Sequence, residues 1–211
     1  MRITKYGHCC LLVEERELRI LTDPGTYSSG YETVRDIDLI LLTHEHPDHF
    51  HLDSLKKVLE NNPRAKVVTN HGVGALMQQE SLMFELLEHG QSRKDKEVLI
   101  EGVGQEHAVI YPTIPNVANT GYFIGGKLFY PGDALTNPER PVDILALPVI
   151  GPWVKISEAA DYARALKPKT WFPVHDGILR NPAMGFKWAS YALDSLNMPG
   201  TELEHGKEID F

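Results

Sequence analysis

Three histidines and one aspartate fall within six residues of the sequence, at His44, His46, Asp48 and His49. Two histidines separated by one residue of extended backbone project to the same side, so His44 and His46 can hold one metal ion. Pro47 then breaks the chain direction and prevents a helix, so Asp48 and His49 can face a second position. The same proline excludes a helical His-Glu-x-x-His zinc site. The segment therefore predicts metal binding.

Four side chains cannot complete two metal sites, so further ligands must come from other parts of the chain. Three candidates each follow a predicted strand: His107, Asp133 and His175. Taken alone, a histidine after a strand is more typical of a surface residue, and a Gly-Asp pair is more typical of a turn. Because loops at strand ends are where functional sites are usually built, the joint placement of all three favours ligands.

These candidates require strands whose ends lie close together. Residues 37–43 form a nearly continuous apolar run, which predicts a strand buried on both faces. Amphipathic spacing predicts helices over residues 52–61, 73–80, 157–166 and 186–196, with Ser157 as an N-cap. Further strands are predicted over residues 3–6, 10–14, 18–22, 66–69, 143–149 and 170–174, with a last hairpin of residues 202–204 and 208–210. This mixture predicts an α/β fold in which sheets are covered by helices.

Composition limits the classes of function. The chain has 211 residues, ten of them histidine, with 21 Lys+Arg against 29 Asp+Glu and a formal net charge of -8. The acidic balance disfavours general binding of nucleic acids or anionic membranes. Cys9 and Cys10 are adjacent and rarely bond to each other, and the first residues lack the apolar run of a signal peptide. We expect a cytoplasmic protein with a small-molecule substrate and no nucleic-acid or membrane partner; a homo-oligomer is compatible with the sequence.

The order of Asp23, the 44–49 segment, His107, Asp133 and His175 resembles the five-motif pattern of the metallo-β-lactamase fold superfamily. The resemblance runs over essentially the whole chain and is closest to small single-domain metal-dependent hydrolases of the L-ascorbate-6-phosphate lactonase type. Further residues that carry it are Gly7-His8, Thr22-Asp23-Pro24, Phe129-Tyr130-Pro131-Gly132-Asp133, Leu145-Ala146-Leu147-Pro148 and Pro173-Val174-His175-Asp176-Gly177. Two departures from that branch, Ala108 after the third-motif histidine and the segment 176–179, concern substrate shape more than metal binding.

The resemblance implies one domain over residues 1–211, folded as a four-layered αβ/βα sandwich of two mixed sheets flanked by helices. It implies two divalent metal ions, with zinc favoured and manganese or iron as alternatives. The implied ligand sets are His44, His46 and His107 for one ion and Asp48, His49 and His175 for the other. Asp133 would bridge both ions, and Asp23 would orient a ligand imidazole.

The mechanism that the resemblance implies uses metal-activated water. Two ions that share Asp133 would share a water molecule, lower its pKa and supply a bridging hydroxide as the nucleophile. Asp48 could accept or relay the proton, so Asp48 and Asp133 are the candidate catalytic residues. The expected reaction is hydrolysis of a small ester, lactone or phosphoester. Two alternatives stay open: a phosphodiesterase or nuclease, which the net charge does not support, and a non-hydrolytic, metal-binding redox member of the same fold.

Four further residues are candidates for substrate contact: His8, Trp153, Lys155 and Asn119. His8 could face the metals from a Gly-His turn, or serve only as a structural turn histidine. Trp153 and Lys155 follow a buried strand and could line a pocket, with Lys155 meeting an anionic group; a packed tryptophan and a solvated lysine are the alternative. Asn119 lies in a turn, and turn chemistry alone also explains an asparagine there.

Overall fold

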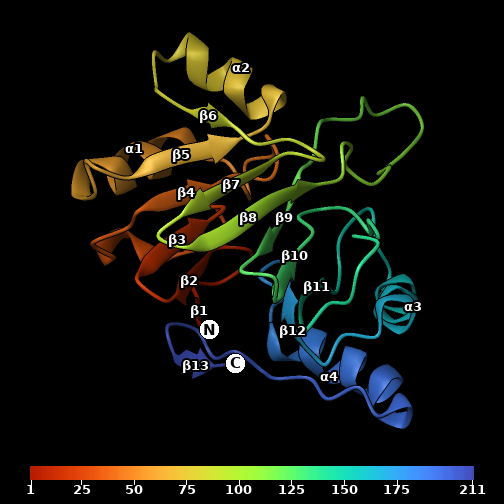
Figure 1. The fold of residues 1–211 in the computed structure, drawn as a ribbon. Coiled ribbons are helices and arrows are strands. Elements are labelled where there is room, and N and C mark those ends of the chain that lie inside the picture. Colours follow the sequence, from red (N-terminus) through yellow and green to blue (C-terminus); the bar gives the residue numbers. More distant parts are fainter.

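The computed structural model describes residues 1–211, apart from the side chain of Ser195, and shows two mixed β-sheets packed face to face (Figure 1). The strand order of the seven-stranded sheet is β13 (Glu208–Asp210), β1 (Arg2–Lys5), β2 (Leu11–Glu15), β3 (Leu18–Thr22), β4 (Leu39–Leu41), β5 (Lys66–Thr69) and β6 (Glu85–Leu86). The order of the six-stranded sheet is β12 (Thr170–Val174), β11 (Ile144–Pro148), β10 (Leu128–Tyr130), β9 (Gly121–Ile124), β8 (Val98–Val103) and β7 (Ser92–Asp95).

Helices cover the outer face of each sheet. Side chains of α1 (Leu52–Asn61) and α2 (His71–Gln79) pack on the seven-stranded sheet, and those of α3 (Ile156–Leu166) and α4 (Ala183–Leu193) pack on the six-stranded sheet (Figure 1). Two short 3-10 turns complete the elements, η1 (Tyr31–Thr33) and η2 (Asp194–Leu196). The four layers expected from the sequence are therefore present. No helix within the described chain has the length and apolar character needed to span a bilayer.

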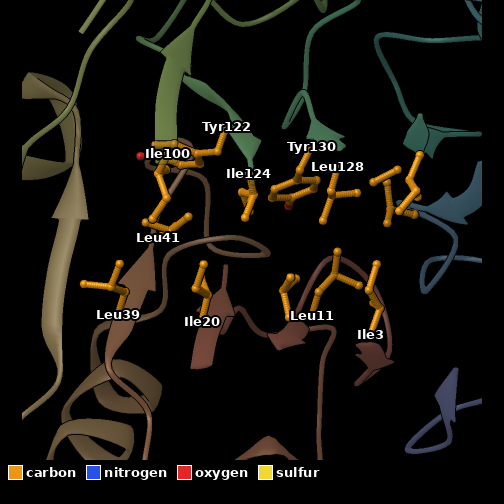
Figure 2. Close-up of a cluster of buried hydrophobic side chains, with 14 of the residues drawn as sticks. Ile3, Leu11, Ile20, Leu39, Leu41, Ile100, Tyr122, Ile124, Leu128 and Tyr130 are labelled. Atoms are coloured by element: carbon orange, nitrogen blue, oxygen red, sulfur yellow. The ribbon is translucent and has the colours of Figure 1, made fainter. Parts of the chain in front are cut away.

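The main hydrophobic core lies between the two sheets. Figure 2 shows side chains of the first sheet, such as Leu39 and Leu41, pointing toward side chains of the second, such as Ile100 and Tyr122. In the same segment, the side chains of Ile40 and Leu42 point to the opposite face of the sheet and pack under α1 and α2. This alternation confirms the prediction of a strand buried on both faces, and each buried aliphatic side chain stabilises the fold by about 1.5–3 kcal/mol.

Strand direction brings the predicted site residues to one edge of the molecule. In the first sheet, β1, β3 and β4 run in the same direction, because β2 is antiparallel to both β1 and β3, and β3 is parallel to β4. In the second sheet, β8, β10, β11 and β12 share a direction by the same reasoning. Backbone hydrogen bonds join the two edges, from the N–H of His175 to the carbonyl of His8 at 3.1 Å and from the N–H of Thr120 to the carbonyl of Thr43 at 2.9 Å.

The predicted C-terminal hairpin is wrong. Residues 199–201 instead run beside β12, where the N–H of Thr201 donates to the carbonyl of Trp171 at 2.8 Å. Leu203 then packs into the core between the sheets, and β13 pairs with β1 of the other sheet. The turn at Gly206 is present, with a φ of 70°. Residues 199–210 thus cross from the six-stranded to the seven-stranded sheet. The start of this segment pairs with β12 and its end pairs with β1, so the two predicted strands do not pair with each other.

Helix boundaries differ from the predictions by a few residues. Ser157 is not the N-cap of α3; Lys155 is, because Glu158 accepts the Lys155 N–H at 2.7 Å and closes the cap earlier. The α2 helix starts at His71 because the Asn70 side chain caps it. The α4 helix starts three residues before the predicted position 186 and continues into η2.

Candidate metal centre

The segment with three of the histidines follows β4 as a tight turn. The backbone N–H groups of His49 and Phe50 both donate to the carbonyl oxygen of His46, at 2.9 and 2.8 Å. A neighbouring loop approaches this turn so closely that a Cβ atom at Gly25 would lie 1.8 Å from the carbonyl oxygen of Asp48. Only glycine permits this approach, so the turn is held by its backbone before any side chain binds a ligand.

Most of the potential ligand atoms form two groups, and a third set combines Cys9 and Asp133 with His49. Within each group these atoms lie within 4.8 Å of one another. The first group consists of His44, His46 and His107, and the second consists of His8, Asp48, His49 and His175. Apart from the addition of His8, these are the two sets that the resemblance implied. Each group combines residues that follow strands of both sheets.

Asp133 lies between the two groups and is 2% exposed. Its Oδ2 atom is 3.4 Å from Nε2 of His107 in the first group and 2.8 Å from Nε2 of His175 in the second. Its Oδ1 atom is 3.1 Å from Nε2 of His49. One carboxylate thus reaches imidazole nitrogens of both groups, which is the placement that a bridging ligand requires.

Backbone carbonyls fix the tautomers of two imidazoles. The Nδ1 atom of His107 donates to the carbonyl oxygen of Ala108 at 2.5 Å, and that of His175 donates to the carbonyl oxygen of Ile150 at 2.6 Å. A carbonyl oxygen can only accept, so each Nδ1 carries the proton. In the neutral ring the Nε2 atom then has a free lone pair, which is the form that binds metals. These same Nε2 atoms approach Asp133.

The centre has unsatisfied polar atoms that a cation would pair. Among the described residues, four buried atoms here lack a hydrogen-bond partner: Nε2 of His44, His49 and His107, and Oδ1 of Asp133. The 3.1 Å between His49 and Asp133 is short but is not aligned as a hydrogen bond. Because each unpaired buried polar group costs about 1–3 kcal/mol, the convergence of these four atoms fits a site that binds a cation. Imidazole and carboxylate donors together fit divalent transition metals.

Asp23 follows β3 directly and is fully buried. Its Oδ1 accepts from the Thr43 N–H at 2.8 Å, and its Oδ2 accepts from the Thr43 hydroxyl at 2.6 Å and from His49 Nδ1 at 2.8 Å. The Tyr130 hydroxyl donates to the same Oδ2. By holding Nδ1 of His49, Asp23 directs the Nε2 atom of this ring toward Asp133. The contributions of Thr43 and Tyr130 were not predicted, although Tyr130 lies within a motif that carries the resemblance and Thr43 directly precedes the 44–49 segment.

His8 lies inside the centre and is fully buried. Its Nδ1 accepts from the backbone N–H of Gly177 at 3.1 Å, which puts the proton of the neutral ring on Nε2. That Nε2 lies 3.2 Å from Oδ2 of Asp48 and can donate to it. The His8 ring also contacts His175, with 4.1 Å between ring centroids. In this tautomer His8 is a hydrogen-bond donor to Asp48.

The buried groups shift one another's pKa values. Burial opposes the charged form of His49, but the Asp133 carboxylate raises the pKa of His49 well above its usual value. Burial also opposes ionisation of Asp48, yet the hydrogen bond from His8 and the charge on His49 lower the pKa of Asp48 to about 2. Burial lowers the pKa of His8 to about 4 and that of His44 well below its usual value. Ionised carboxylates therefore face imidazoles of which His8 and His44 are neutral at pH 7.

Two of the other sequence candidates contact Asp133. The indole N–H of Trp153 donates to Oδ2 of Asp133 at 2.8 Å. The fully buried side chain of Asn119 accepts from the Asp133 backbone N–H at 3.0 Å and donates to the carbonyl of Pro131 at 2.9 Å. Lys155 is exposed at the N-terminal cap of α3. Trp153 and Asn119 therefore hold Asp133 in position, an arrangement the sequence did not indicate.

Cys9 is a further neighbour of the centre that sequence reasoning placed only in the core. It is buried as expected, but its sulfur also lies within 4.8 Å of ligand atoms of His49 and Asp133. Burial raises the pKa of the Cys9 thiol to about 11, so the group is neutral at pH 7. The one signal in the sequence is its position directly after His8.

Comparisons with known proteins identify a family and related proteins for the chain. Residues 2–175 match the family profile of the Beta-lactamase superfamily domain. The Mycobacterium tuberculosis protein Rv0786c is 40% identical over 190 residues, which are 88% of each chain. A Nanoarchaeum equitans protein named UPF0173 metal-dependent hydrolase is 25% identical over 188 residues, 83% of each chain. The solved structure of Igni18, a metallo hydrolase from Ignicoccus hospitalis, matches with a TM-score of 0.78 and 21% identity over 100% of this chain and 98% of that one.

The matching profile spans most of the chain, the fold agrees with the solved structure, and the ligand groups lie where the strands of both sheets end. The chain therefore belongs to the β-lactamase superfamily and has the metallo-β-lactamase fold.

Proposed function

We propose that the chain is a binuclear enzyme that hydrolyses a small ester, lactone or phosphoester. The observation that carries this proposal is the position of Asp133, whose carboxylate reaches imidazole nitrogens of both ligand groups. Divalent cations held there would acidify water and polarise the carbonyl or phosphoryl oxygen of a substrate. The family and the relative named as a metal-dependent hydrolase support this class of reaction.

The proposed ligand sets follow the two groups. They are His44, His46 and His107 for one cation and Asp48, His49 and His175 for the other, with Asp133 shared. His8 belongs to the second group by distance, but its Nε2–H faces Asp48, so we assign it as a donor that positions Asp48. A donor set rich in imidazole suits zinc, and manganese or iron are the alternatives.

Asp48 is the carboxylate best placed to move a proton. Its side chain is 19% exposed, against 3% for Asp133. A proton taken up at Asp48 can therefore exchange with solvent, whereas Asp133 is enclosed by Trp153 and the imidazoles. His8, held in turn by Gly177, donates to Asp48 Oδ2 and fixes which carboxylate oxygen is left to accept a proton.

The metal content tests the first part of the proposal. After reconstitution with zinc or manganese, elemental analysis is expected to find about two metal ions per chain. Asp133→Asn is expected to lower this content because its amide nitrogen cannot act as a ligand. Asp36→Asn is the matched control, since Asp36 is exposed and lies outside the centre. Fewer than about one metal ion per chain in the wild-type protein would refute the site.

The reaction is tested with a panel of lactones, carboxylic esters, thioesters and phosphodiesters. We expect turnover of at least one of these classes by the metal-loaded protein, with a loss of about 100-fold or more in Asp48→Asn and in Asp133→Asn. Asp36→Asn should retain the wild-type rate. A fully loaded protein that turns over none of the classes, or an Asp133→Asn variant with a near wild-type rate, would contradict the proposal.

A further inference from the structure

A cleft of about 530 Å³ opens beside the first ligand group. Two of its lining residues, His46 and His107, are members of that group, and the rest belong to residues 109–116. Most of this loop is apolar, with Val109, Tyr111 and Ile114 among the side chains that line the cleft. None of the described residues that line it is Asp, Glu, Lys or Arg. The cleft therefore joins two candidate ligands to an uncharged, largely apolar wall.

Three apolar side chains of this loop are turned to solvent, whereas Ile110 packs against the core. Val109 is 61% exposed, Tyr111 is 62% exposed and Ile114 is 48% exposed. Scattered exposed apolar residues are common on protein surfaces, but a contiguous set beside a candidate active site is typical of a binding surface. A ligand that covered these side chains would remove their apolar area from water.

The loop is fixed to the metal centre at both ends. At its start, the N–H of Ala108 donates to the carbonyl of Asp133 at 2.8 Å. At its end, the Asn116 side chain donates to the carbonyl of His107 at 2.9 Å. Between these points two prolines, Pro112 and Pro115, restrict the backbone. The cleft wall is thus preformed and keeps its position relative to the imidazoles, so a group bound there would lie at a set distance from the reacting bond.

We propose that this cleft binds an apolar group of the substrate, an alkyl or aryl chain attached to the bond that is hydrolysed. The inference rests on the proposed function, because it places the reaction at the imidazoles that border the cleft. An uncharged wall disfavours a charged group, which would lose its hydration without gaining a partner. A separate cavity of about 390 Å³, which shares Asn116 with the cleft, carries the charged residues Glu88 and Glu106. The two cavities therefore differ in chemistry, and the one bordered by the candidate ligands His46 and His107 is the apolar one.

Binding of n-alkyl carboxylates from acetate to octanoate tests the inference without requiring turnover. The probes are titrated calorimetrically into the zinc-loaded protein, where the carboxylate can bind metal and the chain can enter the cleft. We expect the affinity to rise by up to about fourfold per methylene until the cleft is filled, which is ~0.8 kcal/mol per buried CH₂ converted at 1.4 kcal/mol per tenfold. An affinity independent of chain length would overturn the inference.

A double variant, Val109→Ser with Tyr111→Ser, removes the apolar wall. Both side chains are largely exposed, so the exchange removes little core packing. We expect the dependence on chain length to flatten while the affinity for acetate stays unchanged. Tyr191→Ser is the matched control, because Tyr191 is 68% exposed on α4, and it should keep the wild-type dependence. The same dependence in the double variant as in the wild type would overturn the proposal.

Failure of this inference can be told apart from failure of the proposed function. If the protein binds none of zinc, manganese and iron, the proposed function fails and the substrate cleft fails with it. If zinc binds and esters are hydrolysed without any preference for chain length, only the apolar cleft is refuted. If the double variant keeps the preference but loses binding to phosphatidylcholine vesicles that the wild type shows, the loop contacts a lipid surface and the cleft assignment is wrong.

Discussion

Replacing Asp23 by asparagine tests whether a buried carboxylate sets the geometry of His49. Asp23 has a φ of 36°, near the left-handed region that asparagine also adopts readily. The two side chains have nearly the same shape, so the exchange removes the charge and one acceptor without adding backbone strain. Any effect on the metal centre then comes from the hydrogen bonds of the carboxylate.

The size of the effect follows from the contacts. The carboxylate accepts from the Thr43 N–H, the Thr43 hydroxyl, His49 Nδ1 and the Tyr130 hydroxyl. An asparagine accepts at one atom only, and its NH₂ group must face at least one of these donors. Losing one hydrogen bond to a charged group costs about 1.5–3 kcal/mol, which corresponds to a fall in Tm of about 3–12 °C for a chain of this size. Because His49 is then held less firmly, the metal affinity should fall by about 10–100-fold.

Two measurements check this prediction: competition with a chelator for the metal affinity, and thermal unfolding for the Tm. Asp36→Asn is the matched control, since Asp36 also has a positive φ of 59° but is exposed. Tyr130→Phe removes one donor and keeps the charge, so it should weaken metal binding less than Asp23→Asn. A wild-type metal affinity in Asp23→Asn, with a Tm equal to that of the control, would refute the role assigned to Asp23.

Three further predictions concern the centre and its support. Trp153→Phe removes the indole N–H that binds Asp133, and chelator competition should show a metal affinity about 10–100-fold lower; an unchanged affinity would exclude a positioning role. Lys5→Met leaves the buried carboxylate of Asp176 without its cation, so denaturant unfolding should show a loss of about 3–5 kcal/mol; a loss below 1 kcal/mol would contradict this. Since the pKa of His49 is raised well above its usual value, metal must displace a proton, and affinity should rise with pH. Calorimetry in buffers of different ionisation enthalpy measures that release, and a buffer-independent heat would argue against it.

The candidate ligands were predictable because much of the information is local. His44, His46, Asp48 and His49 fall within six residues, and a proline within the segment limits its backbone to a turn. The strand before it is apolar on both faces, which the structure explains by the alternation of its side chains between two cores. A motif placed directly after such a strand must lie at a sheet edge, whatever the rest of the fold.

The residues that hold these ligands were not predictable in the same way. Tyr130 reaches Asp23 across 107 positions of sequence, and Lys5 reaches Asp176 across 171. These contacts depend on how the two sheets meet, and no local pattern encodes that packing. The assignment of the C-terminal hairpin failed for the same reason, because β13 pairs with β1 at the far end of the chain.

The two ligand groups also explain how metal binding would couple to folding. His46 of the first group follows a strand of the seven-stranded sheet, and His107 follows a strand of the six-stranded sheet. The second group repeats this division with His49 and His175. Neither group is complete unless the sheets pack against each other, so a cation would bind the folded chain more tightly than the unfolded one. At a free metal concentration 100 times its Kd, such binding stabilises the fold by up to about 2.7 kcal/mol. The core between the sheets, shown in Figure 2, and the metal centre at their edge therefore support the same packing.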